Sequence, residues 1–292
     1  MKTFFKYLPS LALVGLLWLL HWLPLPLLRA VGAMIGAVLF VCARSRRRIV
    51  LTNLSLCFPE LSERKRRRLA WRHCIAFAQA FLDRTLLWWA SRPRLERLIR
   101  FHGAENLPAG KPVILLAPHF LGLDAGGIAI SMRYVAFSMY AHQKNPVFDA
   151  VLYAGRIRFN APILLSRQDG LRPAIRALKD GRPFYYLPDM DLGARDAVFV
   201  PFFGTLAATV PAMARLARIS GAVIVPCVTR MVPDGYEVTL DAPWQDYPLG
   251  DDEADARRMN EYIESRVRSM PEQYYWVHRR FKTRPPGEAK IY

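Results

Sequence analysis

The chain has 292 residues, of which 52% are apolar and 12% aromatic, so it can bury a large core and is not a disordered chain. Its four cysteines form no C-x-x-C pair and no zinc-type spacing with histidine, which argues against a disulfide framework and a structural zinc. The formal net charge of +17 predicts an acidic partner: nucleic acid, a phospholipid surface or an acidic protein.

The N-terminal region joins an apolar run to a basic cluster. The 22 residues from Tyr7 to Leu28 carry no charge, and a helix of about 20 residues crosses a bilayer core. A second apolar run, Ala30 to Ala43, is too short to span by itself. Between Arg44 and Arg100 stand fifteen basic residues against four acidic ones. This pattern predicts a membrane anchor over 1–43 and a domain on the cytoplasmic face over 44–292.

Three interpretations of the anchor stay open. Its length and flanking charge favour a spanning helix. Pro9, Pro24 and Pro26 disturb a regular helix, which keeps an interfacial anchor in view. A cleaved signal peptide fits less well, because the run is long and no clear cleavage site precedes the basic cluster. A membrane partner is favoured over nucleic acid, since no helix-turn-helix, zinc or aromatic-sheet pattern accompanies the charge.

A basic amphipathic helix is expected next. It begins near the run Arg64–Arg68, and apolar residues then recur at helical spacing from Leu69 to Trp88. We expect this helix to continue to about Ala90, with one face in the core and the other strongly basic.

From Pro112 onward, short strands and helices alternate. We expect strands at Val113–Ala117, Tyr134–Tyr140, Ile163–Leu165, Phe184–Leu187, Val198–Val200, Ala222–Val228 and, at a sheet edge, Tyr236–Leu240. We expect helices from about Leu123, at Pro146–Arg156, Gly170–Lys179 and Asp251–Ser269, and between Val210 and Ile219. This alternation predicts an α/β fold with a largely parallel core sheet flanked by helices.

The candidate chemistry follows the first of these strands. Pro118 ends the strand, and His119 and Asp124 stand five residues apart across a turn into a helix. On a continuous helix such positions diverge by about 140°, but across a turn they can approach. Ligands of open α/β sheets bind beyond the carboxyl ends of strands. A neutral imidazole can take a proton near pH 7, and a carboxylate can fix its tautomer, so we expect the two groups to touch. The alternative without a catalytic role is that His119 caps the turn and Asp124 caps the helix that follows.

Several longer segments match one family. They are Arg46–Ile49 with Asn53-Leu54 and Cys57–Glu60, His119 with Asp124 as an H-x4-D motif, Gly155–Asn160, Leu165–Arg167, Tyr186–Gly193 with Val198–Gly204, and Pro271–Tyr274 with Trp276–Pro285. Through these segments nearly the whole chain resembles the lipid A biosynthesis acyltransferases of the late, lauroyl/myristoyl type, within the glycerolipid acyltransferase superfamily. Met190 departs from the pattern, because the family usually carries a polar residue between the two aspartates.

The resemblance implies a glycerolipid acyltransferase-like fold and a reaction. A fatty acyl group would pass from acyl carrier protein to a hydroxyl of an acylated, phosphorylated glucosamine-disaccharide lipid of the Kdo-lipid IVA type, in lipopolysaccharide biosynthesis at the bacterial inner membrane. His119 would be the general base and Asp124 would hold its imidazole. Backbone N–H groups after Pro118, or an arginine, would stabilise the oxyanion.

The resemblance also implies binding residues and partners. Arg156, Arg158 and Arg167 would bind acceptor phosphate, and Asp189 and Asp191 would order these arginines, contact acceptor hydroxyls or cap a turn. No metal or cofactor is expected. A basic rim would steer the acidic carrier protein, and membrane lipid would hold the anchor, while the oligomeric state is left open. A transferase acting on a lysophospholipid or another glycolipid, and a non-catalytic basic membrane protein, stay as alternatives.

Overall fold

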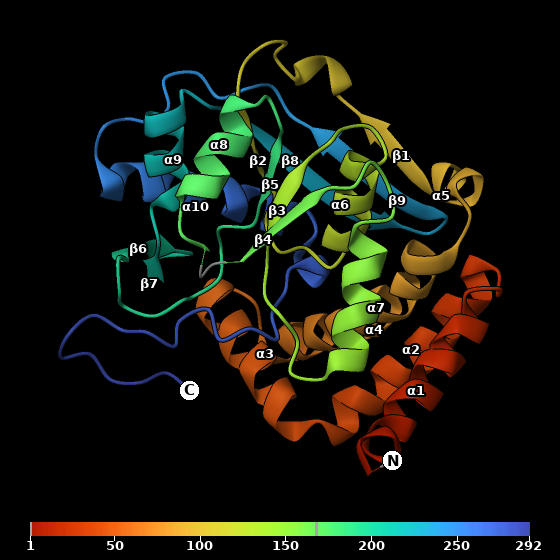
Figure 1. Cartoon of the computed structure of the whole chain (residues 1–292). Coiled ribbons are helices and arrows are strands. Elements are labelled where there is room, and N and C mark those ends of the chain that lie inside the picture. The colour runs from red at the N-terminus through yellow and green to blue at the C-terminus, as the bar shows by residue number, and fades with distance from the viewer. Residues whose placement is uncertain (1, 167–168) are drawn as a thin grey trace.

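A seven-stranded sheet lies at the centre of the computed structural model, which describes residues 2–166 and 169–292 (Figure 1). The strand order is β1-β9-β8-β2-β5-β3-β4. These strands are β1 (Ile99–His102), β2 (Val113–Leu116), β3 (Phe137–Tyr140), β4 (Ile163–Ser166), β5 (Phe184–Tyr186), β8 (Val223–Val232) and β9 (Gly235–Leu240). All neighbours pair in parallel except β8 and β9, so the expected largely parallel α/β fold is confirmed.

Strand β9 lies inside the sheet, so its placement at an edge was wrong. It pairs with β8 on one side and with β1 on the other, from Ile99 opposite Tyr236 to His102 opposite Thr239. Strand β1 has only four residues and follows the basic helix region directly. Its residues alternate apolar and polar side chains, but no turn residue separates them from the helix before, so the sequence does not mark where the strand begins.

Helices connect the strands much as their sequence periodicity predicts. They are α5 (Arg92–Leu98), α6 (Leu123–Ser131), α7 (Pro146–Arg156), α8 (Arg172–Lys179), α9 (Ala212–Ser220) and α10 (Asp252–Ser269), with short 3-10 helices η1 (Ala104–Asn106) and η3 (Pro271–Gln273). Helix α7 begins where expected, because the Asn145 side chain accepts a hydrogen bond from the Val147 N–H and Pro146 occupies the first turn. Strands β6 (Val198–Phe202) and β7 (Thr205–Thr209) form a separate antiparallel pair outside the main sheet.

The N-terminal region forms two apolar helices, α1 (Lys2–Leu20) and α2 (Leu25–Cys42). The expected continuous run from Tyr7 to Leu28 is therefore broken by a turn. Pro24 immediately precedes α2 and Pro26 lies in its first turn, where a missing N–H is tolerated, whereas within one long helix both would remove hydrogen bonds. Within the described part of the chain, α2 is the one helix long and apolar enough to cross a membrane.

The basic region forms α3 (Arg44–Cys57) and α4 (Glu63–Trp89). The Ser62 side chain caps α4 by accepting a hydrogen bond from the Lys65 N–H. Helix α4 ends one residue before Ala90, so the expected amphipathic helix is confirmed.

Two apolar clusters cover the two faces of the sheet. Successive residues of β2 face opposite ways, so Ile114 lies in one cluster and Leu115 in the other. The second cluster also contains Leu17, Leu25 and Leu28 from the N-terminal helices. The helices of the first 43 residues therefore share a core with the sheet, and the proposed division at residue 43 stays a prediction.

Candidate active site

The loop after β2 is held in place by the C-terminal segment. The Leu121 N–H donates to the Gln273 carbonyl at 2.8 Å, and the Tyr275 N–H donates to the His119 carbonyl at 3.0 Å. Phe120 forms an isolated antiparallel bridge with Tyr274. His119 is thus fixed at the carboxyl end of a fully buried strand.

Asp189 holds the imidazole of His119. Nδ1 of His119 lies 2.7 Å from Oδ1 of Asp189, and the His119 backbone N–H donates to both carboxylate oxygens at 3.1 and 3.0 Å. Asp189 is only 1% exposed. Burial by itself raises the pKa of Asp189, but the neighbouring His119 and hydrogen bonds from His119 and Tyr274 outweigh it and hold that pKa below its ordinary value. The carboxyl group is therefore ionised at neutral pH.

This contact sets the tautomer of the imidazole. An ionised carboxylate can only accept hydrogen bonds, so Nδ1 of His119 must carry the proton that it donates to Asp189. In the neutral ring, Nε2 then has a lone pair. That arrangement is the one a general base needs.

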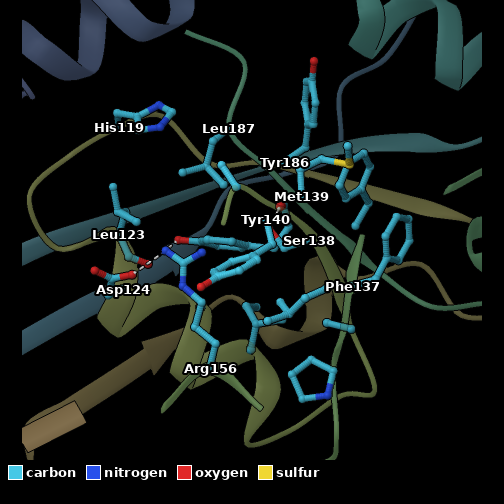
Figure 2. A pocket seen from close by; sticks show the side chains of 18 of the residues that line it. His119, Leu123, Asp124, Phe137, Ser138, Met139, Tyr140, Arg156, Tyr186 and Leu187 are labelled. Atoms are coloured by element: carbon cyan, nitrogen blue, oxygen red, sulfur yellow. Dashed lines mark hydrogen bonds and ion pairs between the residues drawn. The ribbon is translucent and has the colours of Figure 1, made fainter. Parts of the chain in front are cut away.

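Asp124 does not fill the role expected of it, because two arginines hold both of its oxygens. Nε of Arg84 donates to Oδ2 at 2.6 Å, and a terminal nitrogen of Arg156 donates to Oδ1 at 3.1 Å. Burial by itself raises the pKa of Asp124, but Arg84 and Arg156 outweigh it and lower that pKa to about 2. Figure 2 shows Arg156 reaching toward Asp124, with His119 apart from both. The expected contact between His119 and Asp124 is thus replaced by one between His119 and Asp189.

The strand order of the sheet explains why His119 contacts Asp189 and not Asp124. Strands β2 and β5 are parallel neighbours, with Leu116 opposite Tyr186, so their carboxyl ends meet at one edge. His119 follows β2 and Asp189 follows β5, which brings the two side chains together across 70 residues of sequence. The side chain of Asp124 instead meets α4 and α7, which carry its two arginines.

An apolar pocket of about 610 Å³ lies beside these groups (Figure 2). His119, Asp124, Arg84 and Arg156 line it together with apolar and aromatic side chains, which include Leu87, Trp88, Ile128, Phe137, Met139 and Leu164. Such a volume suits a ligand that is mostly apolar and carries a few polar groups at one end. The pocket can therefore hold an apolar chain whose polar end lies near the imidazole.

Met190 lines this pocket between the two aspartates. Asp189 and Asp191 are 1% and 2% exposed and bond to other parts of the fold. An apolar residue at the middle position is therefore suited to the pocket wall.

Asp191 orders the C-terminal segment. Its carboxylate accepts hydrogen bonds from the N–H and the hydroxyl of Thr283, both at 2.8 Å, and from the N–H of Gly193 at 3.0 Å. Nε2 of His278 accepts from the Asp191 N–H at 2.9 Å. These bonds give Asp191 a structural task and no contact with the pocket.

Of the three arginines expected to bind substrate, the structure describes two, and these lie in different places. Arg156 lines the pocket. The guanidinium of Arg158 donates to the carbonyls of Leu87 and Ala90, both at 2.7 Å, and so caps the end of α4. Arg158 is not among the residues that line the pocket, so it is not placed to bind substrate there. Arg167 lies outside the described residues and stays a prediction.

Sequence reasoning missed Arg84 and Tyr274. Asp83 and Arg84 are the only acidic or basic residues between His73 and Ser91, and a charged pair within a long apolar helix is a signal that could have singled them out. Tyr274 hydrogen-bonds the same carboxylate that holds His119 and is 3% exposed. Tyr274 opens the aromatic run Tyr274-Tyr275-Trp276, and nothing in that run marks one ring as the partner of a carboxylate.

Residues 3–283 match the model of the bacterial lipid A biosynthesis acyltransferase family. The chain belongs to this family. It is 36% identical to a lipid A biosynthesis lauroyltransferase of Escherichia coli over 96% of this chain and 93% of the relative. It is 35% identical to the lipid A biosynthesis myristoyltransferase of that organism, over 91% and 83% of the two chains. The solved 1-acyl-sn-glycerophosphate acyltransferase of Thermotoga maritima is similar, with a TM-score of 0.38 and 16% identity over 84% of this chain and 97% of that one.

Membership of the lipid A biosynthesis acyltransferase family makes this chain an enzyme that transfers acyl groups. The pocket fits that activity, since an acyl chain is apolar and its carboxyl carbon is the reacting atom. Among the described residues, no group of three or more His, Cys, Asp or Glu side chains could hold a metal ion.

Proposed function

We propose that this acyltransferase moves a fatty acyl group from the thioester of acyl carrier protein to a hydroxyl of an acylated, phosphorylated glucosamine-disaccharide lipid. The acceptor is a lipid A precursor of the Kdo-lipid IVA type, and the reaction takes place at the cytoplasmic face of the bacterial inner membrane. The observation that carries the proposal is an imidazole, oriented by a buried carboxylate, at an apolar pocket of about 610 Å³.

In the proposed reaction, Nε2 of His119 removes the proton of the acceptor hydroxyl as that oxygen attacks the thioester carbonyl carbon. The carbonyl oxygen becomes an oxyanion in the tetrahedral intermediate. The carbon–sulfur bond then breaks, the new ester remains, and the leaving thiolate takes the proton from the imidazolium. Asp189 keeps Nδ1 protonated and stabilises the imidazolium while it exists.

The oxyanion needs a hydrogen-bond donor, and the backbone after Pro118 offers little. The N–H of His119 donates to Asp189, that of Phe120 to the Pro118 carbonyl, and that of Leu121 to Gln273. Arg84, which lines the pocket, is therefore the donor that we favour for the oxyanion.

Arg84 and Arg156 are suited to bind a phosphate of the acceptor. Their side chains are 33% and 31% exposed. Each guanidinium uses only some of its N–H donors in its contact with Asp124. A guanidinium has five N–H donors in a rigid fork, so donors remain for a phosphate. Because the pKa of Asp124 is about 2, its carboxylate stays charged across the neutral range and holds both arginines in place. Asp124 is thus proposed as a positioning residue for two arginines.

Arg156→Lys should raise the KM for the acceptor about tenfold or more and leave kcat nearly unchanged. Lysine keeps the charge but loses the bidentate fork, and a hydrogen bond to a charged group contributes about 1.5–3 kcal/mol. The measurement is steady-state kinetics with varied acceptor. Arg195→Lys is the control, since Arg195 is 95% exposed on a loop and should leave KM unchanged. An unaltered KM in Arg156→Lys would remove Arg156 from the phosphate site.

The whole proposal is tested by incubating the purified enzyme with acyl-carrier-protein thioester and a panel of lipid acceptors. The lipid A precursor should gain the mass of one acyl chain, as measured by mass spectrometry. Transfer to a lysophospholipid in preference to the lipid A precursor would assign the other acceptor class and overturn ours.

A salt series tests the donor. The net charge of +17 predicts that transfer from the acidic carrier protein weakens with ionic strength more than transfer from a neutral thioester surrogate. Equal salt sensitivity for the two donors would contradict electrostatic steering.

A further inference from the structure

The mouth of the pocket can be located from the exposure of the residues that line it. Leu171 and Leu192 line the pocket and are 47% and 48% exposed. Ala141, Gln143 and Gly170 also line it and are exposed. A residue that lines a pocket and also faces solvent stands where the pocket opens. The mouth therefore lies between the β3–α7 loop, the start of α8 and the loop after β5.

Helix α8 carries a basic face that begins at this mouth. Leu171 immediately precedes the helix, and Arg172, Arg176 and Lys179 follow at spacings of four and three residues. Residues at these spacings share one face of a helix, and all three are exposed. The opposite face of α8 is buried in the core. The basic face thus extends from the mouth for about 10 Å along the helix.

The three cations of this face are available to a partner. Within the part of the chain that the structure describes, Arg172, Arg176 and Lys179 form no ion pair and no side-chain hydrogen bond. The arginines of the neighbouring helix α9 are instead paired with acidic residues of α10. Three unpaired cations on one exposed face attract a negatively charged partner to the mouth of the pocket.

The basic face of α8 lies away from the predicted anchor. Figure 1 shows α8 in the upper part of the molecule and α1 and α2 at its lower right. The β3–α7 loop forms the side of the mouth that borders α1, where the Asn145 side chain donates to the Ser10 hydroxyl at 2.8 Å. A membrane that contacts α1 and α2 therefore leaves α8 in water. A soluble acidic protein suits this face better than a lipid surface.

A second exposed basic cluster lies too far from the pocket to serve its mouth. It stands in the first turns of α4 and comprises Arg64, Lys65, Arg67 and Arg68. Helix α4 is continuous, so Arg68 lies about 24 Å along it from Arg84, which lines the pocket. The basic face of α8, in contrast, begins beside Leu171 at the mouth itself.

We propose that the basic face of α8, with Leu171 at its start, is the docking surface for the acyl donor. The donor is a small acidic protein that carries the acyl group as a thioester on a flexible arm. The inference rests on the proposed function, which names acyl carrier protein as the donor, and adds the place where that protein docks. Its acidic side chains meet Arg172, Arg176 and Lys179, and Leu171 gives an apolar contact inside this charged rim.

Docking at α8 separates the paths of the two substrates. The arm of the donor enters between Leu171 and Leu192 and brings the thioester to His119, while the acyl chain fills the apolar pocket. Arg84 and Arg156, which are proposed to bind acceptor phosphate, belong to α4 and α7, and both of these helices contact α1. The donor therefore approaches from the side of α8 and leaves the side that borders the predicted anchor open to the lipid.

Charge reversal on α8 tests this surface. Arg176→Glu combined with Lys179→Glu should lower kcat/KM for carrier-protein thioester about tenfold or more, because two attractive contacts become repulsive. With acyl-pantetheine, a neutral thioester that lacks the protein, kcat/KM should be unchanged. The measurement is steady-state kinetics of the purified full-length enzyme, with varied donor and a fixed concentration of lipid A precursor. Normal transfer from acyl-pantetheine also shows that the variant is folded.

Arg67→Glu combined with Arg68→Glu is the matched control, since it makes the same change in net charge at the exposed start of α4. This variant should keep a nearly normal kcat/KM for carrier-protein thioester. Equal losses in both double variants would mean that net charge alone attracts the donor, and a loss in the α4 variant only would move the dock to α4. Either result overturns α8 as the docking surface, and so does the absence of a loss in the α8 variant.

A salt series distinguishes a failure of this inference from a failure of the proposed function. Transfer from the carrier protein should lose its extra salt sensitivity, relative to acyl-pantetheine, in the α8 variant and keep it in the α4 variant. If the wild-type enzyme takes no acyl group from the carrier protein, the proposed donor is wrong. If it does, and the α8 variant keeps the full salt sensitivity, the donor stands and the docking surface on α8 is wrong.

Discussion

Asp189→Asn should lower kcat by about 100- to 10,000-fold, although the substitution changes few atoms. The carboxylate now accepts the proton of Nδ1 at 2.7 Å and so leaves Nε2 of His119 unprotonated. An asparagine NH2 group in its place can donate to Nδ1, which favours the tautomer with the proton on Nε2. The base would then hold a proton where it must accept one, and the imidazolium would lose its counter-charge.

Asp191→Asn is the matched control for this experiment. Asp191 is as deeply buried as Asp189 and lies two residues farther along, but it bonds to Thr283 and Gly193. The Asp191→Asn substitution should lower the Tm and leave kcat per folded molecule near normal. Measuring kcat, Tm and the pH dependence of kcat for both variants separates orientation of the base from stability. Near-normal turnover in Asp189→Asn, with a large loss in Asp124→Asn, would restore Asp124 as the partner of the imidazole.

The position of His119, the proposed base, could be predicted from sequence, but the partner of its imidazole could not. The buried strand, the proline that ends it and the helix from Leu123 place His119 at the carboxyl end of β2, as the structure confirms. The choice of Asp124 followed from nearness in sequence. Asp189 comes from a strand 70 residues away, and only the parallel pairing of β2 with β5 makes it a neighbour. Strand order is not contained in local periodicity.

The N-terminal helices show the same limit of local pattern. Hydropathy and length indicated an anchor, and α2 does pass the test for a span. Helix α2 packs closely against α4 through Arg29, Gly32 and Gly36. In the sequence these residues appear only as one charged and two small residues in an apolar helix. Their contacts cannot be predicted from local pattern, because Asp83 and the backbone of α4 come to lie opposite them only in the folded chain. A lone charged residue in an apolar helix indicates that a partner of opposite charge lies nearby in the fold, because an unpaired buried charge is costly.

His119→Ala should also lower kcat by about 100- to 10,000-fold while leaving membrane association and folding intact. The imidazole is 18% exposed beside the pocket, so its removal opens space without uncovering the core. His102→Ala is the control, because His102 is exposed at the end of β1. The His102→Ala enzyme should transfer acyl groups at the normal rate. Steady-state kinetics with carrier-protein thioester and the lipid acceptor provide the measurement, and near-normal transfer by well-folded His119→Ala would exclude His119 as the base.

The double variant His119→Ala, Asp189→Asn makes this prediction sharper. If Asp189 acts through the imidazole, its substitution costs nothing further once the imidazole is gone, so the double variant should be as slow as His119→Ala alone. Independent contributions would instead multiply, and the double variant would fall well below either single one. Multiplied losses would mean that the carboxylate of Asp189 contributes to catalysis by a route other than His119, despite the 2.7 Å contact that joins them.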